Sequence, residues 1–474
     1  MIQLVLGLLA SAGGGGSGSG GGGSTGVGAL MFFVGYGPTY AWSARTRRKY
    51  KSKDPERFAA MQAPIWTAGS VYAFLWLALA IIVLQGSFFW FALMLAASAG
   101  SIIGVGAGLY NWAGKVKQSV QVKNALQQSA LQDRGWNEEH LTQGVKNVWF
   151  AFQRDWSRND AAATTAYLTP WYHAHISLMI AALQQMGRQN NMVNPEVIEA
   201  KIIAVNDVAD NRQDSFTVGI EAYAEDQLID VTTNKVIYTN KKSFTEFWDF
   251  YRDGDSWRLG GITPSTTAGW TANLPLQEFA RNNGFYYSLD WGWLLLPTRG
   301  QLFNGGTFGT SDINNHCIGW YQGTYDKILT QLYTYSINPQ IPNAYMIAQA
   351  TLPRNYGNIV VRRRKGLFQP KIKGLKEVST EWQDFNKMYQ VFATSPEQAT
   401  SLELLNPKYM EQLAAVPFEI NVEVVDQALY IYAPLTGANG KKLAQGSRSD
   451  DGDVANSYQM LLWALAAAFK EMKM

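Results

Sequence analysis

One long tract without charge constrains this chain most, because residues 64–114 contain no Asp, Glu, Lys or Arg. Gly86-Ser87 divides the tract into two apolar halves. A helix rises roughly 1.5 Å per residue, so each half is about as long as a bilayer is thick. We therefore expect residues 64–112 to form a transmembrane helical hairpin. The alternative is a hydrophobic hairpin buried in a protein core.

The segment before this tract adds a further apolar stretch and a basic loop. Residues 1–26 are rich in glycine and predict a flexible tail, whereas residues 27–44 are apolar and just long enough to span a membrane. Residues 45–63 form the basic loop, which contains Arg45, Arg47, Arg48 and Lys49. These four cations are candidate contacts for an anionic membrane surface.

Charge asymmetry predicts the topology of these segments. A helical hairpin returns the chain to the side it left, so loop 45–63 and everything after Lys115 face one compartment. Basic loops stay inside, which makes that compartment the cytoplasm and puts the N-terminus outside. The sequence thus predicts a multi-pass protein of the inner (plasma) membrane. Whether residues 1–12 are a cleaved signal and whether residues 27–44 span stay open.

Composition excludes some classes of function. The net charge of +3 on 474 residues is too small to indicate nucleic-acid binding. Cys317 is the single cysteine, so an internal disulfide is impossible. The chain contains no G-x-S-x-G, P-loop, H-E-x-x-H or C-x-x-C motif. We expect neither a cofactor nor a metal.

The chain after the membrane tract changes from helical to alternating patterns. Residues 115–141 predict a polar helical connector. Three helices follow: an amphipathic helix over residues 145–156, a short helix between Asp160 and Tyr167, and a third that begins at Pro170 and ends before Gly187. After Pro195 apolar and polar residues alternate, which predicts about four antiparallel strands. Helices followed by strands indicate an α+β domain.

A pattern of mostly aromatic residues lies at the C-terminal end of this domain. It consists of Phe244, Glu246, Trp248, Phe250, Arg252, Trp257, Leu259 and Ile262, preceded by Trp156, Asp160 and YLTP at 167–170. Residues 142–265 thereby resemble the C-terminal domain of subunit 44 of the mitochondrial inner-membrane translocase and its bacterial relatives. The resemblance implies a cone-shaped α+β fold of the nuclear-transport-factor-2 superfamily, with an apolar pocket. It also implies association with anionic membranes and protein partners, and no enzymatic activity.

Residues 275–474 predict a second α+β domain. Its Phe385-Asn386-Lys387 and Leu429-Tyr430-Ile431 resemble an uncharacterised domain of bacterial membrane-hairpin proteins, which implies a fold and no activity. Residues 384–413 predict a strand, a turn and a helix, and Asp426-Gln427 predicts a hairpin turn. The apolar helix at 456–472 is short for a bilayer, so we expect it to pack on the domain.

Aromatic residues and one acid make up the candidate site of the first domain. The candidate pocket or sheet-core residues are Trp149, Trp156, Tyr167, Trp171, Phe244, Glu246, Trp248, Phe250 and Trp257. Alternation places Glu246 on one strand face with Trp248 and Phe250. We expect its carboxylate to be satisfied by Arg, Trp or backbone donors. The alternative is a buried catalytic base.

Several short patterns resemble metal sites without completing one. Asp253-Gly254-Asp255 and Asp450-Asp451-Gly452-Asp453 lack the acidic residue at the twelfth position of a calcium loop, and the former predicts a hairpin turn. His173 and His175 are two residues apart and would diverge on a helix. His316-Cys317 has no further ligands nearby.

A second basic run lies in the C-terminal domain. It comprises Arg362, Arg363, Arg364, Lys365, Lys371 and Lys373. One interpretation is a solvated sheet edge, where lysines discourage pairing with other chains. The other is contact with anionic headgroups, worth roughly 1 kcal/mol per basic residue near the surface. The sequence leaves both open.

The sequence predicts a membrane-anchored, non-enzymatic scaffold or adaptor. Its cytoplasmic domains would bind unidentified protein partners and anionic membrane lipids, in a role in membrane protein transport or biogenesis. The second hypothesis is a lipid or small apolar ligand held in the cone-shaped domain. A third is an enzyme that uses Glu246 as a base. Homo-oligomerisation stays open.

Overall fold

The structure is a computed structural model of the chain. It describes residues 119–264, 274–290, 292–303, 311–323, 327–337, 344–365, 371–395, 405–435 and 451–474. The expected membrane segments 27–44 and 64–112, and loop 45–63 with Arg45, Arg47, Arg48 and Lys49, lie outside these ranges. In the part of the chain that is described, no helix is both long and apolar enough to cross a membrane.

The chain divides into two compact units. The described part of the first comprises residues 119–138 and Ile203–Val205. Residues 119–132 are helical, and a short 3-10 helix, η1 (Arg134–Trp136), follows, capped by the Asp133 side chain. The second unit contains Glu139–Ile202 and Asn206–Met474, and it holds the two sheets described next.

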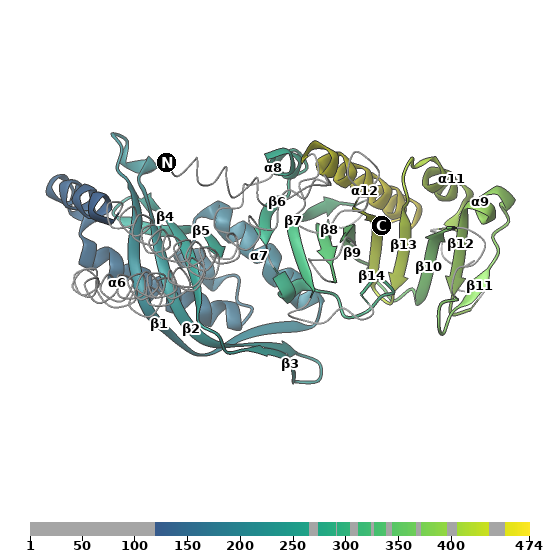
Figure 1. The fold of residues 1–474 in the computed structure, drawn as a ribbon, viewed down its shortest axis with the longest axis horizontal. Helices are drawn as coiled ribbons and strands as arrows, with labels where there is room; N and C mark the ends of the chain where they lie inside the picture. Colours follow the sequence, from purple (N-terminus) through teal and green to yellow (C-terminus); the bar gives the residue numbers. More distant parts are fainter. Residues whose placement is uncertain are drawn as a thin grey trace, which may run out of the picture. The chain divides into compact units, whose positions relative to one another are not determined.

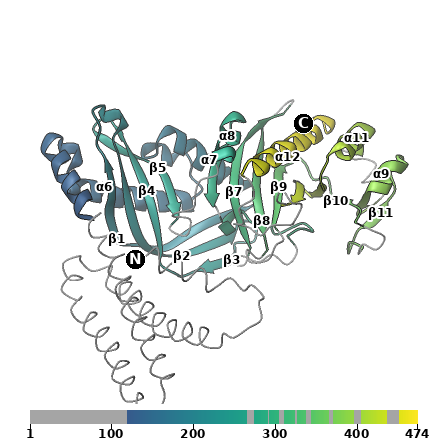
Figure 2. The same ribbon diagram turned by 45° about the horizontal axis from the view of Figure 1, so that its top comes forward.

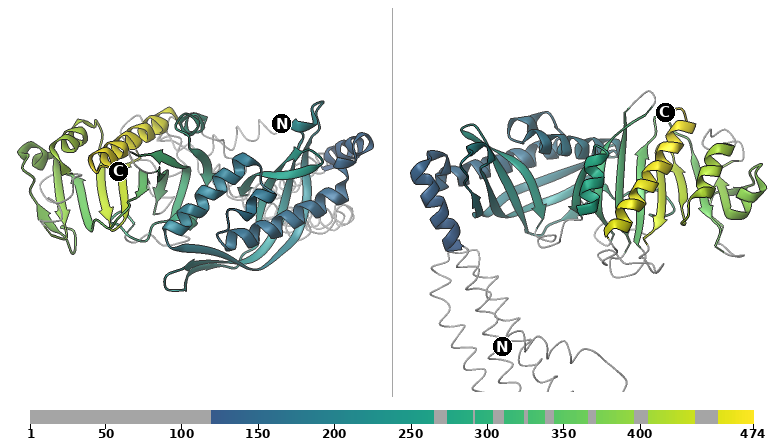
Figure 3. Two further views of the ribbon diagram at one scale, coloured as in Figure 1. Left: turned by 180° about the vertical axis from the view of Figure 1, so that it is seen from behind. Right: turned by 90° about the horizontal axis from the view of Figure 1, so that it is seen from above.

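The first sheet and its helices occupy residues 138–264. Its elements are α6 (Glu138–Ser157), η2 (Ala163–Ala166), α7 (Pro170–Gln185), β1 (Arg188–Asn206), η3 (Asn211–Gln213), β2 (Ser215–Asp230), β3 (Lys235–Asn240), β4 (Phe244–Asp253) and β5 (Ser256–Pro264). The strand order is β1-β2-β4-β5, and β3 pairs with the far end of β2. Helices α6 and α7 lie across one face of this sheet (Figure 1; Figure 3, left).

Local signals set the boundaries of these elements. Thr169 caps α7 by accepting a hydrogen bond from the backbone N–H of Tyr172, Pro170 is its first residue, and Gly187 follows it with a φ of 63°. Strands β4 and β5 are joined at Gly254, whose φ is 61°. The prediction that Asp253-Gly254-Asp255 is a hairpin turn is therefore confirmed.

Two strand boundaries differ from the expected ones. Strand β1 begins at Arg188 and runs through Pro195, because β1 is an edge strand on which a missing N–H is tolerated. The first sheet has five strands where about four were expected, because residues 235–253 form two strands, β3 and β4. Both pair with β2, at Asp226–Asp230 and at Ser215–Ala222, because β2 is longer than either.

Even-numbered residues of β2 and β4 form the core of the first sheet. Phe216, Val218 and Ile220 of β2 are at most 2% exposed, and so are Trp248 and Phe250 of β4. Burying each such side chain stabilises the fold by about 1.5–3 kcal/mol. The matching apolar face of α6 is also buried, as its spacing predicted.

The second sheet has nine strands among the described residues, in the order β11-β12-β10-β13-β14-β9-β8-β7-β6. In chain order the elements are α8 (Leu274–Asn282), β6 (Tyr286–Asp290), η4 (Gly292–Leu295), β7 (Asp312–Gln322), β8 (Lys327–Ser336), β9 (Ala344–Thr351), β10 (Asn358–Arg363), β11 (Lys376–Val378), α9 (Gln383–Met388), β12 (Tyr389–Ala393), α11 (Pro407–Ala415), β13 (Asn421–Val425), β14 (Ala428–Pro434) and α12 (Asp451–Glu471). Figure 2 shows α8, α12 and α11 on the same side of this sheet.

The hairpin β13–β14 turns at Asp426, whose φ is 54°, so the predicted turn is confirmed. It lies between β9 and β10, which are consecutive in the chain but not neighbours in the sheet. Residues 384–388 were expected to be strand and form part of α9 instead, with β12 directly after it.

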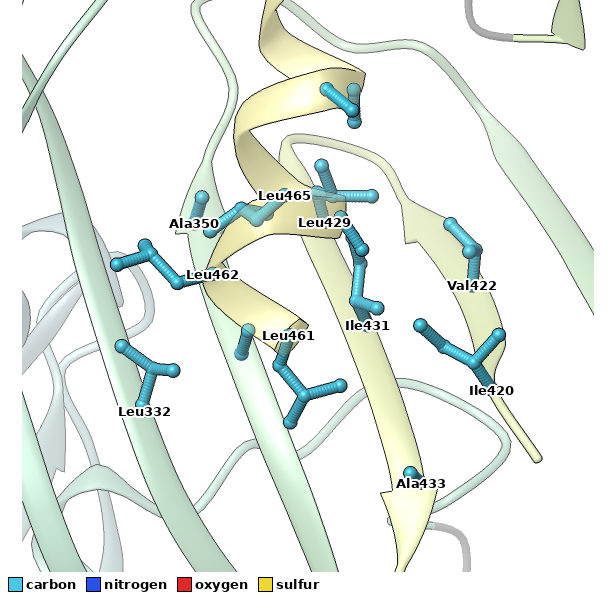
Figure 4. Close-up of a cluster of buried hydrophobic side chains, with 14 of the residues drawn as sticks. Leu332, Ala350, Ile420, Val422, Leu429, Ile431, Ala433, Leu461, Leu462 and Leu465 are labelled. Atoms are coloured by element: carbon cyan, nitrogen blue, oxygen red, sulfur yellow. The ribbon is translucent and has the colours of Figure 1, made fainter. Parts of the chain in front are cut away.

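Helix α12 packs against the second sheet, as its apolar sequence predicted. Leu461, Leu462 and Leu465 point toward Leu332, Ala350, Leu429 and Ile431 of the strands (Figure 4). Tyr458, at 0% exposed, donates a hydrogen bond to the carbonyl of Asn315 at 3.0 Å. The helix therefore forms part of the core of its own domain.

Candidate functional site

A chain of aromatic rings fills the described interior between α6 and the first sheet. Phe152 stacks on Trp156 with ring centroids 5.9 Å apart and meets the Trp248 ring edge-on at 5.5 Å. From Trp248 the contacts continue to Phe250 at 6.5 Å and from Phe250 to Phe216 at 5.1 Å. The interior is thus packed with side chains of this chain along most of β4.

Glu246 lies at the end of this ring chain. The Trp248 indole N–H donates a hydrogen bond of 2.9 Å to one carboxylate oxygen of Glu246. The pKa of Glu246 is raised to about 7, mainly by burial and to a smaller extent by the nearby charge of Asp226, against the opposing effect of the Trp248 hydrogen bond. Trp was among the donors expected for this carboxylate. Near neutral pH the group changes protonation state readily.

Asp226 brings a second carboxylate into the same interior. The Asn190 amide donates to Asp226 at 2.5 Å and accepts a hydrogen bond of 2.8 Å from the Trp156 indole. Burial raises the pKa of Asp226 to about 6, against the effect of the Asn190 hydrogen bond. Trp156 on α6, Asn190 on β1 and Asp226 on β2 thereby tie three elements together.

Tyr172 on α7 is the third titratable group facing this interior. It is 6% exposed, and its pKa is raised by burial first and by the charge of Glu246 second. Two carboxyl groups that titrate near neutrality beside a phenol could in principle exchange protons with a ligand. In the described residues, however, each carboxylate is held by a neutral donor from the fold.

The remaining candidate residues are not part of this ring chain. Trp149 is fully buried beside Phe150, and Tyr167 donates a hydrogen bond of 3.0 Å to Asp155, which Arg154 also contacts. Trp257 lies beyond the ring chain, edge-on to Phe216, and Phe244 is partly buried at the start of β4.

Trp171 is half exposed and meets Tyr251 edge-on at 5.3 Å. Of the nine candidates, Trp156, Glu246, Trp248 and Phe250 therefore belong to the interior described above, and Trp171 lies at the surface.

Five residues of this interior were missed by the sequence argument: Phe152, Tyr172, Asn190, Phe216 and Asp226. Phe152 and Phe216 carried a signal, because their spacing marks them as core positions of α6 and β2. Asn190 and Asp226 carried none, because they meet only when β1 pairs with β2.

The basic run of the second domain divides into two groups. Arg362 donates to Gln390, Arg363 to the carbonyls of Val416 and Phe418, Arg364 to Glu377, and Lys365 pairs with Glu419. These four cations therefore connect β10 to neighbouring elements. Lys371 and Lys373, by contrast, are exposed, and so is Lys376 on the edge strand β11.

The histidines occupy separate environments. His173 lies 3.1 Å from the carbonyl of Ala161, whereas the His175 ring stacks on Tyr286 at 5.5 Å and contacts the Ser288 hydroxyl at 3.2 Å. His316 contacts the Gln331 side chain at 3.0 Å. Over the described ranges, no three His, Cys, Asp or Glu side chains gather in a way that could hold a metal ion.

A surface hollow of about 390 Å³ lies elsewhere, between α8 and β6. It is lined by Gln277, Ala280, Arg281, Gly284, Phe285, Tyr286 and Tyr287. None of these residues belongs to the interior around Glu246. The predicted apolar pocket of the first domain thus has no support from this hollow.

Comparison with known proteins identifies the first domain. The family model of the Tim44-like domain matches residues 122–264. No curated protein matches the chain. The crystal structure of the mycobacterial trehalose monomycolate transport factor A is 13% identical, with 42% of this chain and 94% of that chain covered and a TM-score of 0.30. The intermembrane space region of the chloroplast protein ARC6 is 14% identical, with 26% and 95% covered and a TM-score of 0.21.

The match over residues 122–264 falls on nearly the same part of the chain as the resemblance predicted over residues 142–265. It includes α6, α7 and the whole first sheet. The chain therefore contains a Tim44-like domain, which is a mixed α+β fold.

Proposed function

We propose that this chain is a membrane-anchored, non-enzymatic scaffold that acts in membrane transport or biogenesis. One observation carries the proposal: the Tim44-like domain at 122–264 begins directly after the uncharged tract 64–114. A binding domain fixed so close to a bilayer is confined to work at that surface. Its partners would then be proteins and lipids of the same membrane.

The interior of the Tim44-like domain supports binding rather than catalysis. Glu246 and Asp226 accept hydrogen bonds from Trp248 and Asn190, which are themselves part of the fold. Ring contacts along β4 occupy the space beside them. Such carboxylates serve to fix the packing of the domain. The same ring contacts favour the scaffold over an apolar ligand held in this interior.

The contact with anionic lipid is proposed for Lys371, Lys373 and Lys376. These side chains are exposed. Arg362 to Lys365 are instead tied to groups of the domain by hydrogen bonds or ion pairs, with Arg364 and Lys365 themselves exposed. At roughly 1 kcal/mol per basic residue, three lysines would contribute about 3 kcal/mol at a surface rich in anionic lipid. The attraction extends about 8 Å at physiological ionic strength, so it requires close approach.

A single fluorophore can test this contact in the full-length protein. Cys317 is the one native cysteine and is 0% exposed, so Lys373→Cys provides a unique labelling site. The labelled protein is reconstituted in bilayers of phosphatidylcholine alone or with phosphatidylglycerol. We expect an environment-sensitive dye to shift to the blue only with phosphatidylglycerol, and the shift to weaken as salt is raised.

Paired charge changes provide the control. Lys371→Glu with Lys376→Glu should abolish the blue shift, because both side chains are exposed and their loss leaves the core intact. Glu278→Gln, an exposed change on α8, should leave it unchanged. An equal dye signal in both lipid mixtures would rule out the lipid contact. Extraction of the protein from native membranes by alkaline carbonate would rule out the anchor.

A further inference from the structure

The outer face of the first sheet carries a carboxylate in an unusual setting. Strand alternation puts Asp249 and Tyr251 on the face opposite the buried Trp248 and Phe250. Asp249 lies between Thr217 of β2 and Gly261 of β5 in the sheet register. Asp249 and Tyr251 are partly exposed, so solvent reaches this face.

The two oxygens of Asp249 have different surroundings. One accepts a hydrogen bond of 2.6 Å from the Thr217 hydroxyl. The other faces Gly261, where an added Cβ would lie 3.5 Å from it. Among the described residues no cation pairs with Asp249, whereas the neighbouring Asp214 and Asp253 pair with arginines. This second oxygen is on a partly exposed face, so a hydrogen-bond donor from outside the domain can reach it.

Aromatic side chains stand beside this carboxylate. Tyr251 is two residues along the same strand, and Trp171 meets its ring edge-on with centroids 5.3 Å apart. The Trp171 indole N–H donates to the carbonyl of Gly260 at 3.3 Å, which fixes the ring at the sheet surface, and 50% of Trp171 stays exposed.

Glycine at 260 makes this arrangement possible. A Cβ there would lie 2.4 Å from the Tyr251 ring and 3.1 Å from Trp171. Gly260 is also the extra residue of a bulge where the β4–β5 register shifts. Trp171 reaches this point because residues 167–169 bond to β5 at Leu259 immediately before α7 begins.

A carboxylate beside exposed aromatic rings matches the chemistry of an organic cation. Rings attract positive charge over their faces, and the carboxylate supplies the counter-charge. The second oxygen of Asp249 can accept a charge-assisted hydrogen bond, which a guanidinium or a primary ammonium can donate and a quaternary ammonium cannot. We propose that Thr217, Asp249, Tyr251, Gly260, Gly261 and Trp171, here named the Asp249 face, bind a basic side chain of a protein partner.

The Asp249 face is separate from the lysines of the second domain, and its assignment rests on its own geometry. Fluorine NMR of full-length protein in detergent, labelled with 5-fluorotryptophan, can test it. Trp171→Phe identifies the Trp171 resonance among the 17 tryptophans. Ethylguanidinium chloride is titrated against sodium chloride at equal ionic strength. We expect a saturable shift of the Trp171 resonance at millimolar concentration.

Two variants test whether the shift of the Trp171 resonance depends on the Asp249 carboxylate. Asp249→Asn should weaken binding at least fivefold while the other tryptophan resonances stay in place, which shows that the fold is intact. Asp210→Asn removes an exposed carboxylate elsewhere and should change nothing. The proposal is overturned if Asp249→Asn binds like the native protein, if sodium chloride gives the same shift, or if tetramethylammonium binds as strongly as ethylguanidinium.

Discussion

The charge of Glu246 should destabilise the Tim44-like domain at high pH. Its pKa is about 7 in the fold against an ordinary 4.5. At 1.36 kcal/mol per pH unit, that separation corresponds to about 3.4 kcal/mol. Solvent reaches part of the side chain and screens it, so we expect about 1–2 kcal/mol. The folded carboxyl holds its proton longer, so stability is full below pH 4.5 and falls as the pH rises toward 7.

Glu246→Gln should therefore stabilise the domain at pH 8 by about 1–2 kcal/mol and leave it unchanged at pH 4.5. Glutamine keeps an acceptor for the Trp248 indole N–H. Part of the pH dependence should remain, because the pKa of Asp226 is also raised, to about 6. Hydrogen exchange of the β4 amides in the full-length protein, measured by mass spectrometry, reports the local free energy of opening.

The comparison variant is Asp210→Asn, an exposed carboxylate whose pKa is lowered by Arg212. It should give no gain at pH 8. Equal protection of the native protein and Glu246→Gln at both pH values would refute the argument. A loss of protection in Glu246→Gln at pH 8 would show instead that the fold stabilises the charged form, which is the behaviour expected of a functional carboxylate.

Three further changes test the packing by thermal unfolding. Asp214→Asn should lower the free energy of unfolding by about 3–5 kcal/mol, because it leaves the buried Arg252 without its counter-charge. An unchanged unfolding midpoint would show that this ion pair contributes little to stability. Gly319→Ala should lower the free energy of unfolding by about 1–3 kcal/mol, because the added Cβ would lie 2.0 Å from the Phe285 ring. Combining it with Phe285→Leu should restore part of this loss. Burial lowers the pKa of His175 to about 3, so the stability of the native protein should fall as the pH drops below 6.5. His175→Gln should make this fall less steep. An equally steep fall in the variant would contradict the role given to His175.

Sequence signals that act over a few residues predicted the structure well. Pro170 at the start of α7 and Gly187 after its end are both local signals, and the helix has the expected bounds. The contact of Glu246 with Trp248 is local in the same sense, since two residues on one strand face are neighbours.

Pairings between distant residues could not be predicted in this way. Nothing near β9 or β10 in the sequence shows that the β13–β14 hairpin separates them. The basic run is a second example. Arg364 and Lys365 are exposed, as expected of surface charges, but their partners Glu377 and Glu419 become neighbours only in the folded domain.

Strand β4 shows why the residues that identify the domain are not those that would bind a partner. The family pattern Phe244, Glu246, Trp248 and Phe250 follows one face of the strand, where the chain meets its own core. Asp249 is three residues from Glu246 and so lies on the other face. Burial raises the pKa of both carboxyls, and each accepts a hydrogen bond from a neutral donor.

The difference between the two lies in what surrounds each carboxylate. Glu246 contacts the Trp248 ring, which packs on Phe152 and Phe250, so a partner there would meet the core side chains of this domain. Asp249 lies beside two glycines and the half-exposed Trp171, where a partner's side chain can approach without moving the core. The core-facing residues of β4 therefore identify the domain in the sequence. The residues that alternate with them, such as Asp249, face outward and are available to bind other molecules.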